Sequence, residues 1–140
     1  MTHSHLITYT DGGSRGNPGP SASGVVIKDA HGTTIKAFGE WLGRQTNNYA
    51  EYTAILQALR AAKEFGAETV EMRMDSELAV KQLKGEYKVK NPGIAAIFLR
   101  IHNELIGFKK VTFHHVRREF NTEADAEVNK TLDKHLGKDE

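Results

Sequence analysis

The stretch LITYTDGGSRGNPG, residues 6–19, decides the fold and is the starting point for the rest of the chain. Its first part, Leu6 to Thr10, alternates apolar and β-prone residues and predicts a strand. The alternation ends at Asp11, and the glycines that follow predict a turn whose backbone can adopt tight or positive-φ conformations. A carboxylate at a strand end beside such a loop suits a metal ion bound to a phosphate ester. An Asp-Gly pair is also typical of an ordinary turn, so this stretch alone leaves both interpretations open.

The composition indicates one globular unit. The chain has 140 residues, 39% hydrophobic and 26% charged, which predicts a single domain over residues 1–140. It has no apolar run of about 18 residues and no visible secretory signal, so we expect no membrane partner. The absence of cysteine excludes disulfides, thiolate catalysis and cysteine-ligated zinc. It is compatible with the reducing cytoplasm, where we expect the protein to work as a monomer.

Periodicity predicts a mixed α/β order of elements. The predicted strands cover residues 6–10, 22–28, 34–42, 69–74 and 110–116, and the predicted helices cover residues 47–65, 76–83, 92–106 and about 122–132. Short connections between the first three strands predict an antiparallel meander. The last two strands need helical crossovers to join the same sheet. The sequence therefore predicts a five-stranded mixed sheet flanked by helices.

Four acidic residues lie at boundaries of these predicted elements. Asp11 follows the first strand and Asp75 the fourth. Glu51 lies in the first turn of the long helix predicted at residues 47–65, and Asp125 in the first turn of the last helix, at about residues 122–132. Each has an ordinary explanation on its own, because acids are favoured as caps and near helix N-termini. If the four converged, they would repel one another unless divalent metal neutralised them. Oxygen-only ligands favour Mg²⁺ or Mn²⁺, and two such ions could hydrolyse a phosphodiester.

Basic residues are concentrated in one third of the chain. Residues 81–118 hold nine lysines and arginines against Glu86 and Glu104. Such a segment can bind nucleic acid, but it can equally be a solvated face.

Taken together, these motifs resemble type 1 ribonuclease H. The resemblance rests on Thr10-Asp11-Gly12-Gly13-Ser14 with Gly16-Asn17-Pro18-Gly19, on Thr46-Asn47-Asn48-Tyr49-Ala50-Glu51, on Asp75-Ser76, and on Arg118-Glu119-Phe120-Asn121 with Ala124-Asp125. It runs from about Leu6 to Leu132 with the motifs in the family's order.

The resemblance implies a ribonuclease H-like fold and an endonuclease that cuts the RNA strand of RNA–DNA hybrids, leaving 5′-phosphate and 3′-hydroxyl ends. It also implies two Mg²⁺ or Mn²⁺ ions bound by Asp11, Glu51, Asp75 and Asp125. Gly12, Asn17, Thr46, Asn47 and Asn48 match positions that contact the hybrid. Amides and hydroxyls of this kind can read 2′-hydroxyls in a wide, shallow groove.

Two departures place the chain near a compact archaeal and bacterial subgroup. Arg118 stands where many relatives have a loop histidine, and by resemblance it assists catalysis, although a phosphate-binding arginine is the alternative. Residues 84–90 form only a short basic segment in place of the long basic handle of some relatives. Some members of this subgroup also cut double-stranded RNA.

Two other functions stay open from the sequence. One is a different nuclease of the same superfamily, such as a junction resolvase or transposase core, which the Thr46-Asn47-Asn48 and Gly16-Asn17-Pro18-Gly19 segments disfavour. The other is a non-catalytic nucleic-acid-binding module, which the presence of all four carboxylates disfavours.

Overall fold

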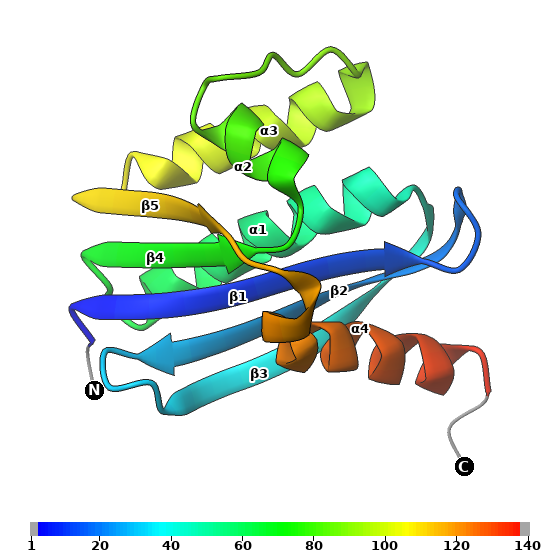
Figure 1. Cartoon of the computed structure of the whole chain (residues 1–140), viewed down its shortest axis with the longest axis horizontal. Coiled ribbons are helices and arrows are strands. Elements are labelled where there is room, and N and C mark those ends of the chain that lie inside the picture. Colours follow the sequence, from blue (N-terminus) through cyan, green and yellow to red (C-terminus); the bar gives the residue numbers. More distant parts are fainter. Residues whose placement is uncertain (1–2, 138–140) are drawn as a thin grey trace.

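The computed structural model describes residues 3–137, so both ends of the expected domain lie outside the described residues. It confirms the predicted five-stranded mixed sheet, whose strand order is β3-β2-β1-β4-β5 (Figure 1). The strands are β1 (His5–Ser14), β2 (Gly19–Asp29), β3 (Thr34–Gln45), β4 (Thr69–Met74) and β5 (Lys110–His115). The first three are antiparallel, and β4 lies parallel to both β1 and β5.

Helices cover the two faces of this sheet unequally. They are α1 (Asn47–Glu64), α2 (Glu77–Leu83), α3 (Pro92–Leu105) and α4 (Thr122–His135), with a short 3₁₀ turn, η1 (Arg118–Phe120), before the last. In Figure 1 the helix α1 lies behind the sheet and α4 lies across its front. Two separate groups of buried side chains match this arrangement, because the larger is built around α1 and α3 and the smaller around Val128 and Leu132 of α4.

Alternation in β1 and the helical period of α1 build the larger core. Leu6, Thr8 and Thr10 are buried while their neighbours in β1 are half-exposed. Tyr52 and Leu59 of α1 are buried against this face. Burying a side chain of this size stabilises the fold by about 1.5–3 kcal/mol, so this face fixes α1 firmly on the sheet.

The first strand is longer than the sequence predicts. It was expected to end at Thr10, but it continues to Ser14 because Gly12 and Gly13 remain paired with Ser23 and Ala22 of β2. The turn therefore begins after Ser14, and Asp11 lies within the strand. Glycine in the interior of a strand usually destabilises it. Here Gly12 allows the close approach of α1 described below.

The segment between α2 and α3 is short, as the sequence predicts for a chain without the long basic handle of some relatives. Residues 84–91 form no helix or strand, and all but Val89 are exposed. Over residues 3–137, no helix is long and apolar enough to span a bilayer.

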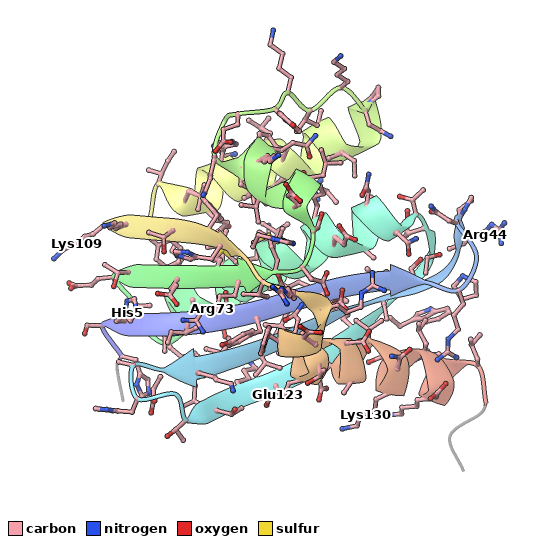
Figure 2. The ribbon with its side chains drawn as sticks, viewed as in Figure 1. His5, Arg44, Arg73, Lys109, Glu123 and Lys130 are labelled. Atoms are coloured by element: carbon pink, nitrogen blue, oxygen red, sulfur yellow. The ribbon has the colours of Figure 1, made fainter. Side chains whose placement is uncertain are left out.

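Figure 2 shows where the two ends of the parallel strands lie. His5, the first residue of β1, and Lys109, just before β5, lie at the same end of the strands. The chain leaves the opposite ends of β1 and β4 through the segments that carry the predicted site.

Candidate active site

One open cleft of about 360 Å³ gathers most of the predicted site residues. Its lining comes from β1, from the first half of α1, and from the segments after β4 and β5. The lining residues are Asp11, Gly12, Gly13, Ser14, Asn47, Glu51, Asp75, Arg118 and Asp125. The four predicted carboxylates and Arg118 therefore lie around one cleft, although they are distant in the sequence.

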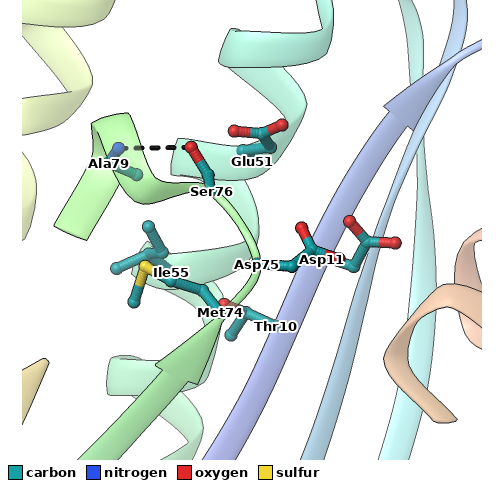
Figure 3. Close-up of a pocket in the computed structure, with 8 residues that line it drawn as sticks. All are labelled: Thr10, Asp11, Glu51, Ile55, Met74, Asp75, Ser76 and Ala79. Atoms are coloured by element: carbon teal, nitrogen blue, oxygen red, sulfur yellow. Dashed lines mark hydrogen bonds between the residues drawn. The ribbon is translucent and has the colours of Figure 1, made fainter. Parts of the chain in front are cut away.

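Strand register brings Asp11 and Asp75 together. Thr10 of β1 pairs with Met74 of the parallel strand β4, so the next residue of each strand is an aspartate. Figure 3 shows the two side chains next to each other, Asp11 within β1 and Asp75 just after the end of β4. The parallel register of the two strands therefore places the two carboxylates side by side.

Glu51 reaches the cleft because α1 approaches β1 unusually closely at Gly12. A Cβ atom on Gly12 would lie 2.2 Å from the carbonyl carbon of Ala50 and 2.3 Å from the backbone nitrogen of Glu51. Only glycine leaves room for this contact. The sequence placed Glu51 in the first turn of the helix, which is wrong: Thr46 is the N-cap and α1 begins at Asn47, so Glu51 follows that turn.

Asp125 enters from the other side of the sheet, in the first turn of α4 as predicted. Its carboxylate accepts a hydrogen bond from Nδ2 of Asn129 at 3.2 Å. Arg15 is near the same helix, where its guanidinium pairs with Asp133 at 2.7 Å. Asp125 is thus oriented by its own helix.

Crowding of carboxylates raises the pKa of two of them. Burial raises the pKa of Asp11 to about 8, helped by the charge of Asp75 and by a hydrogen bond with Asp125, while the Gly12 N–H opposes the shift. Burial likewise raises the pKa of Glu51 to about 7. The charge of Asp75 adds to this upward shift, while a hydrogen bond with Ser76 and the charge of Arg118 oppose it. The cleft therefore holds protons at neutral pH when no cation is bound.

This raised pKa predicts a pH-dependent stability in EDTA. Folded Asp11 keeps its proton up to about pH 8, whereas in the unfolded chain the carboxyl loses it near its ordinary pKa of 3.8. The contribution of protonated Asp11 to the free energy of unfolding is complete below the pKa of the unfolded chain. It is lost as the pH rises through the pKa of the folded protein. Between about pH 5 and 9 we expect Asp11→Asn to become more stable than the parent by on the order of 2 kcal/mol.

Urea unfolding at several pH values would measure this difference. Asp29→Asn is a suitable control, because hydrogen bonds from Thr33 and His31 lower the pKa of that exposed carboxylate, so its stabilising contribution is lost only as the pH falls. Equal pH dependence in the parent and Asp11→Asn would contradict the burial of a protonated Asp11.

The residues predicted to contact substrate are only partly brought together. Asn47 lines the cleft, where its Oδ1 accepts the Ser14 N–H at 2.8 Å, and its own N–H donates to Oδ1 of Asn17 at 3.1 Å. Thr46 is exposed, and its hydroxyl caps α1 by accepting the Tyr49 N–H. Asn48 is also exposed. Asn17, Thr46 and Asn48 lie outside the cleft lining.

Two polar residues outside the predicted site set also act on the carboxylates. Ser76, and not Asp75, is the N-cap of α2, where its hydroxyl accepts the Ala79 N–H at 3.2 Å (Figure 3). As a hydrogen-bond partner Ser76 also lowers the pKa of Glu51. A serine before a helix signals a cap but not a second partner. Asn121 stands just before α4, where an asparagine is typical of a helix cap, yet its side chain donates to Asp75 at 3.4 Å.

The donor set fits a hard divalent cation. The charges of Asp75 and Asp125 both act on Asp11, and all the candidate ligand atoms are carboxylate oxygens. A bound cation would replace the protons that these carboxylates retain. Within residues 3–137, no three histidine or acidic side chains are already arranged as ligands around one point.

Both the sequence and the fold of this chain match known proteins. A family profile described as "Reverse transcriptase-like" matches residues 9–131. Ribonuclease HI of Halobacterium salinarum is 43% identical over 125 residues, 89% of this chain and 63% of the relative. The crystal structure of RNase H1 from the same archaeon is 42% identical, with a TM-score of 0.90 over 93% of this chain and 98% of that one.

A second solved relative was crystallised with nucleic acid. LC11-RNase H1 in complex with RNA/DNA hybrid is 44% identical, with a TM-score of 0.90 over 94% of this chain and 99% of that one. The curated relatives can be much longer, since the chain spans 63% of the archaeal protein and 35% of a bifunctional protein from Mycobacterium tuberculosis.

Proposed function

The chain belongs to the type 1 ribonuclease H family, and on that premise we propose that it is a metal-dependent endoribonuclease acting on the RNA strand of RNA–DNA hybrids. The observation that carries this proposal is the gathering of Asp11, Glu51, Asp75 and Asp125 with Arg118 around one cleft. A module that only bound nucleic acid would gain nothing from four carboxylates, which repel phosphate.

The carboxylates would hold two Mg²⁺ or Mn²⁺ ions, with Asp11 between Asp75 on one side and Asp125 on the other. When bound, such ions activate a water molecule and stabilise the departing 3′ oxygen of the phosphodiester. Asp11 and Glu51 give up their protons on loading, which turns a neutral pair into anionic ligands.

The remaining chemistry falls to Arg118 and the water. Arg118 is the cation of the cleft lining, and its charge already acts on Glu51. We assign it to the non-bridging oxygens of the scissile phosphate, where it stabilises the charge that develops during attack. Water adds to phosphorus, the P–O3′ bond breaks and the 3′ oxygen takes up a proton, giving 5′-phosphate and 3′-hydroxyl ends.

Recognition of the hybrid is assigned to the polar segment beside the cleft. Asn17 and Asn47 are already hydrogen-bonded to each other, so they present a fixed set of amide groups. Thr46 and Asn48 are exposed next to them, and Gly12 lines the cleft beside Asp11. The related LC11-RNase H1 has been crystallised in complex with RNA/DNA hybrid, which supports a hybrid as the ligand of this segment.

Mass spectrometry of the cleavage products tests the reaction. We expect RNA fragments that carry 5′-phosphate and 3′-hydroxyl ends, formed in Mg²⁺ or Mn²⁺ and not in EDTA. Fragments with 2′,3′-cyclic phosphate, or cutting that persists in EDTA, would mean that the RNA 2′-hydroxyl is the nucleophile and would refute the proposal.

The exposed lysines after α2 should add salt-dependent affinity for the hybrid. Replacing Lys84, Lys88 and Lys90 by alanine should raise the KM for the hybrid. It should also reduce the slope of log KM against log salt concentration by the amount that corresponds to about two to three lost phosphate contacts. The measurement is KM as a function of salt concentration. A triple replacement of Lys36, Lys130 and Lys134 changes the charge equally; Lys130 lies on α4 (Figure 2). An equal effect from both triples would contradict a local contact.

Three further expectations stay predictions: that residues 1–140 form one catalytic domain, that the protein is a monomer, and that it works in the cytoplasm. Whether it also cuts double-stranded RNA is a separate question. An RNA duplex in the cleavage assay answers it directly.

A further inference from the structure

Asn121 is a buried amide at the junction of three elements of the site. Its side chain is 1% exposed and lies between the end of β1 and the start of α4. Its Nδ2 donates to the carbonyl oxygen of Thr10 at 2.9 Å and to Oδ2 of Asp75 at 3.4 Å. Both partners accept hydrogen bonds only, so they fix which end of the amide faces them.

This asparagine does not do what an asparagine in its position normally does. It is the N-cap of α4, where the side-chain oxygen usually accepts an N–H from the first turn, but no such side-chain bond forms. Asn91, the N-cap of α3, shows the ordinary arrangement, because its Oδ1 accepts the Gly93 N–H at 2.8 Å. The amide of Asn121 is thus used as a donor toward the site, not as an acceptor for its helix.

The arrangement has a cost to stability. Oδ1 of Asn121 is buried without a hydrogen-bond partner among the described residues, and the first turn of α4 lacks its side-chain cap. Both losses are unfavourable for folding. Local rules of this kind are broken mainly where function requires it.

We propose that Asn121 is a positioning residue that holds the carboxylate of Asp75 for metal binding. It anchors on the Thr10 carbonyl, one residue before Asp11, and from there reaches Asp75, so it ties the two strand ends together. Its backbone carbonyl also accepts the N–H of Asp125 at 3.2 Å, which links the third carboxylate to the same residue. The inference rests on the proposed function, since it concerns the same carboxylates.

The substitution Asn121→Asp separates this role from capping. Aspartate has the same shape and caps helices as well as asparagine, but it has no N–H to donate and brings a second oxygen against Asp75. If capping were the role of Asn121, the variant would be neutral. Asn91→Asp makes the identical change at a cap that uses only the acceptor, and it lies outside the cleft.

Isothermal titration with Mn²⁺, together with kcat and KM on a hybrid, gives the test. Losing an outer partner of a metal ligand typically costs 10–100-fold in metal affinity or activity, so we expect Asn121→Asp to lose at least about 10-fold in both Mn²⁺ affinity and kcat. KM for the hybrid should stay close to the parental value, and Asn91→Asp should match the parent throughout.

Asn121→Ala keeps the test decisive if the aspartate variant does not fold. A fall in its Mn²⁺ affinity and kcat supports the positioning role. A fall in its melting temperature alone, or parental values for folded Asn121→Asp, would overturn it. If the parent cuts no hybrid, the proposed function fails, and the Mn²⁺ titration still decides the role of Asn121.

Discussion

Asp75→Asn should reduce the rate of hybrid cleavage by at least about 10³-fold while leaving hybrid affinity within a few-fold of the parent. Asparagine keeps the shape of the side chain and its contact with Asn121 but removes the negative charge that a divalent cation needs. Asp75 also raises the pKa of both Asp11 and Glu51, so its replacement relieves repulsion and should not unfold the metal-free protein.

Single-turnover cleavage and anisotropy of a labelled hybrid would measure rate and affinity separately. Asp29→Asn, at the last residue of β2, removes the same charge outside the cleft and should cut at the parental rate. Cleavage by Asp75→Asn at a comparable rate would show that the metal site is wrongly assigned. Loss of binding along with cleavage would show that Asp75 acts mainly on the substrate.

The second large effect is expected at Gly12. In Gly12→Ala the new methyl group would meet backbone atoms of Ala50 at 2.2 and 2.4 Å, which cannot rotate away as a side chain can. Helix α1 must shift from β1, and Glu51 moves with it. We expect a loss of about 3–5 kcal/mol in the free energy of unfolding, with cleavage falling further than the unfolded fraction explains.

Gly13→Ala is the matched control, because it lies next in the same strand and its methyl group would meet only Cγ1 of Val128 at 3.2 Å. Urea unfolding of both variants gives the comparison. Equal stability of the two alanine variants would contradict the close approach of α1 at Gly12.

Much of the fold follows from the pattern of the sequence. The alternation in β1 and the 3.6-residue period of α1 are strong local signals, and they place Leu6 and Tyr52 in the core as observed. The position of Asp75 directly after β4 also follows from the pattern. The end of β1 does not, because pairing with β2 overrides the turn preference of Gly12 and Gly13.

The carboxylates and Arg118 that line the cleft could be picked out from the sequence, but their geometry could not. Spacing alone cannot show that Asp11 and Asp125 share a hydrogen bond, since they are brought together from opposite ends of the chain by packing. Burial sets the raised pKa of Asp11, and burial is a property of the folded state. The donor role of Asn121 was likewise hidden, because the sequence signal at that position is that of a helix cap.

Cleavage of one 5′-labelled RNA strand, annealed to DNA, annealed to RNA or left single, tests the proposed function most directly. Each form would be incubated with the protein in Mg²⁺, Mn²⁺ or EDTA. We expect metal-dependent cutting of the RNA within the hybrid and no cutting of the single strand. Binding of the hybrid without cutting in either metal would contradict the assignment of Asp11, Glu51, Asp75 and Asp125 as a catalytic metal site.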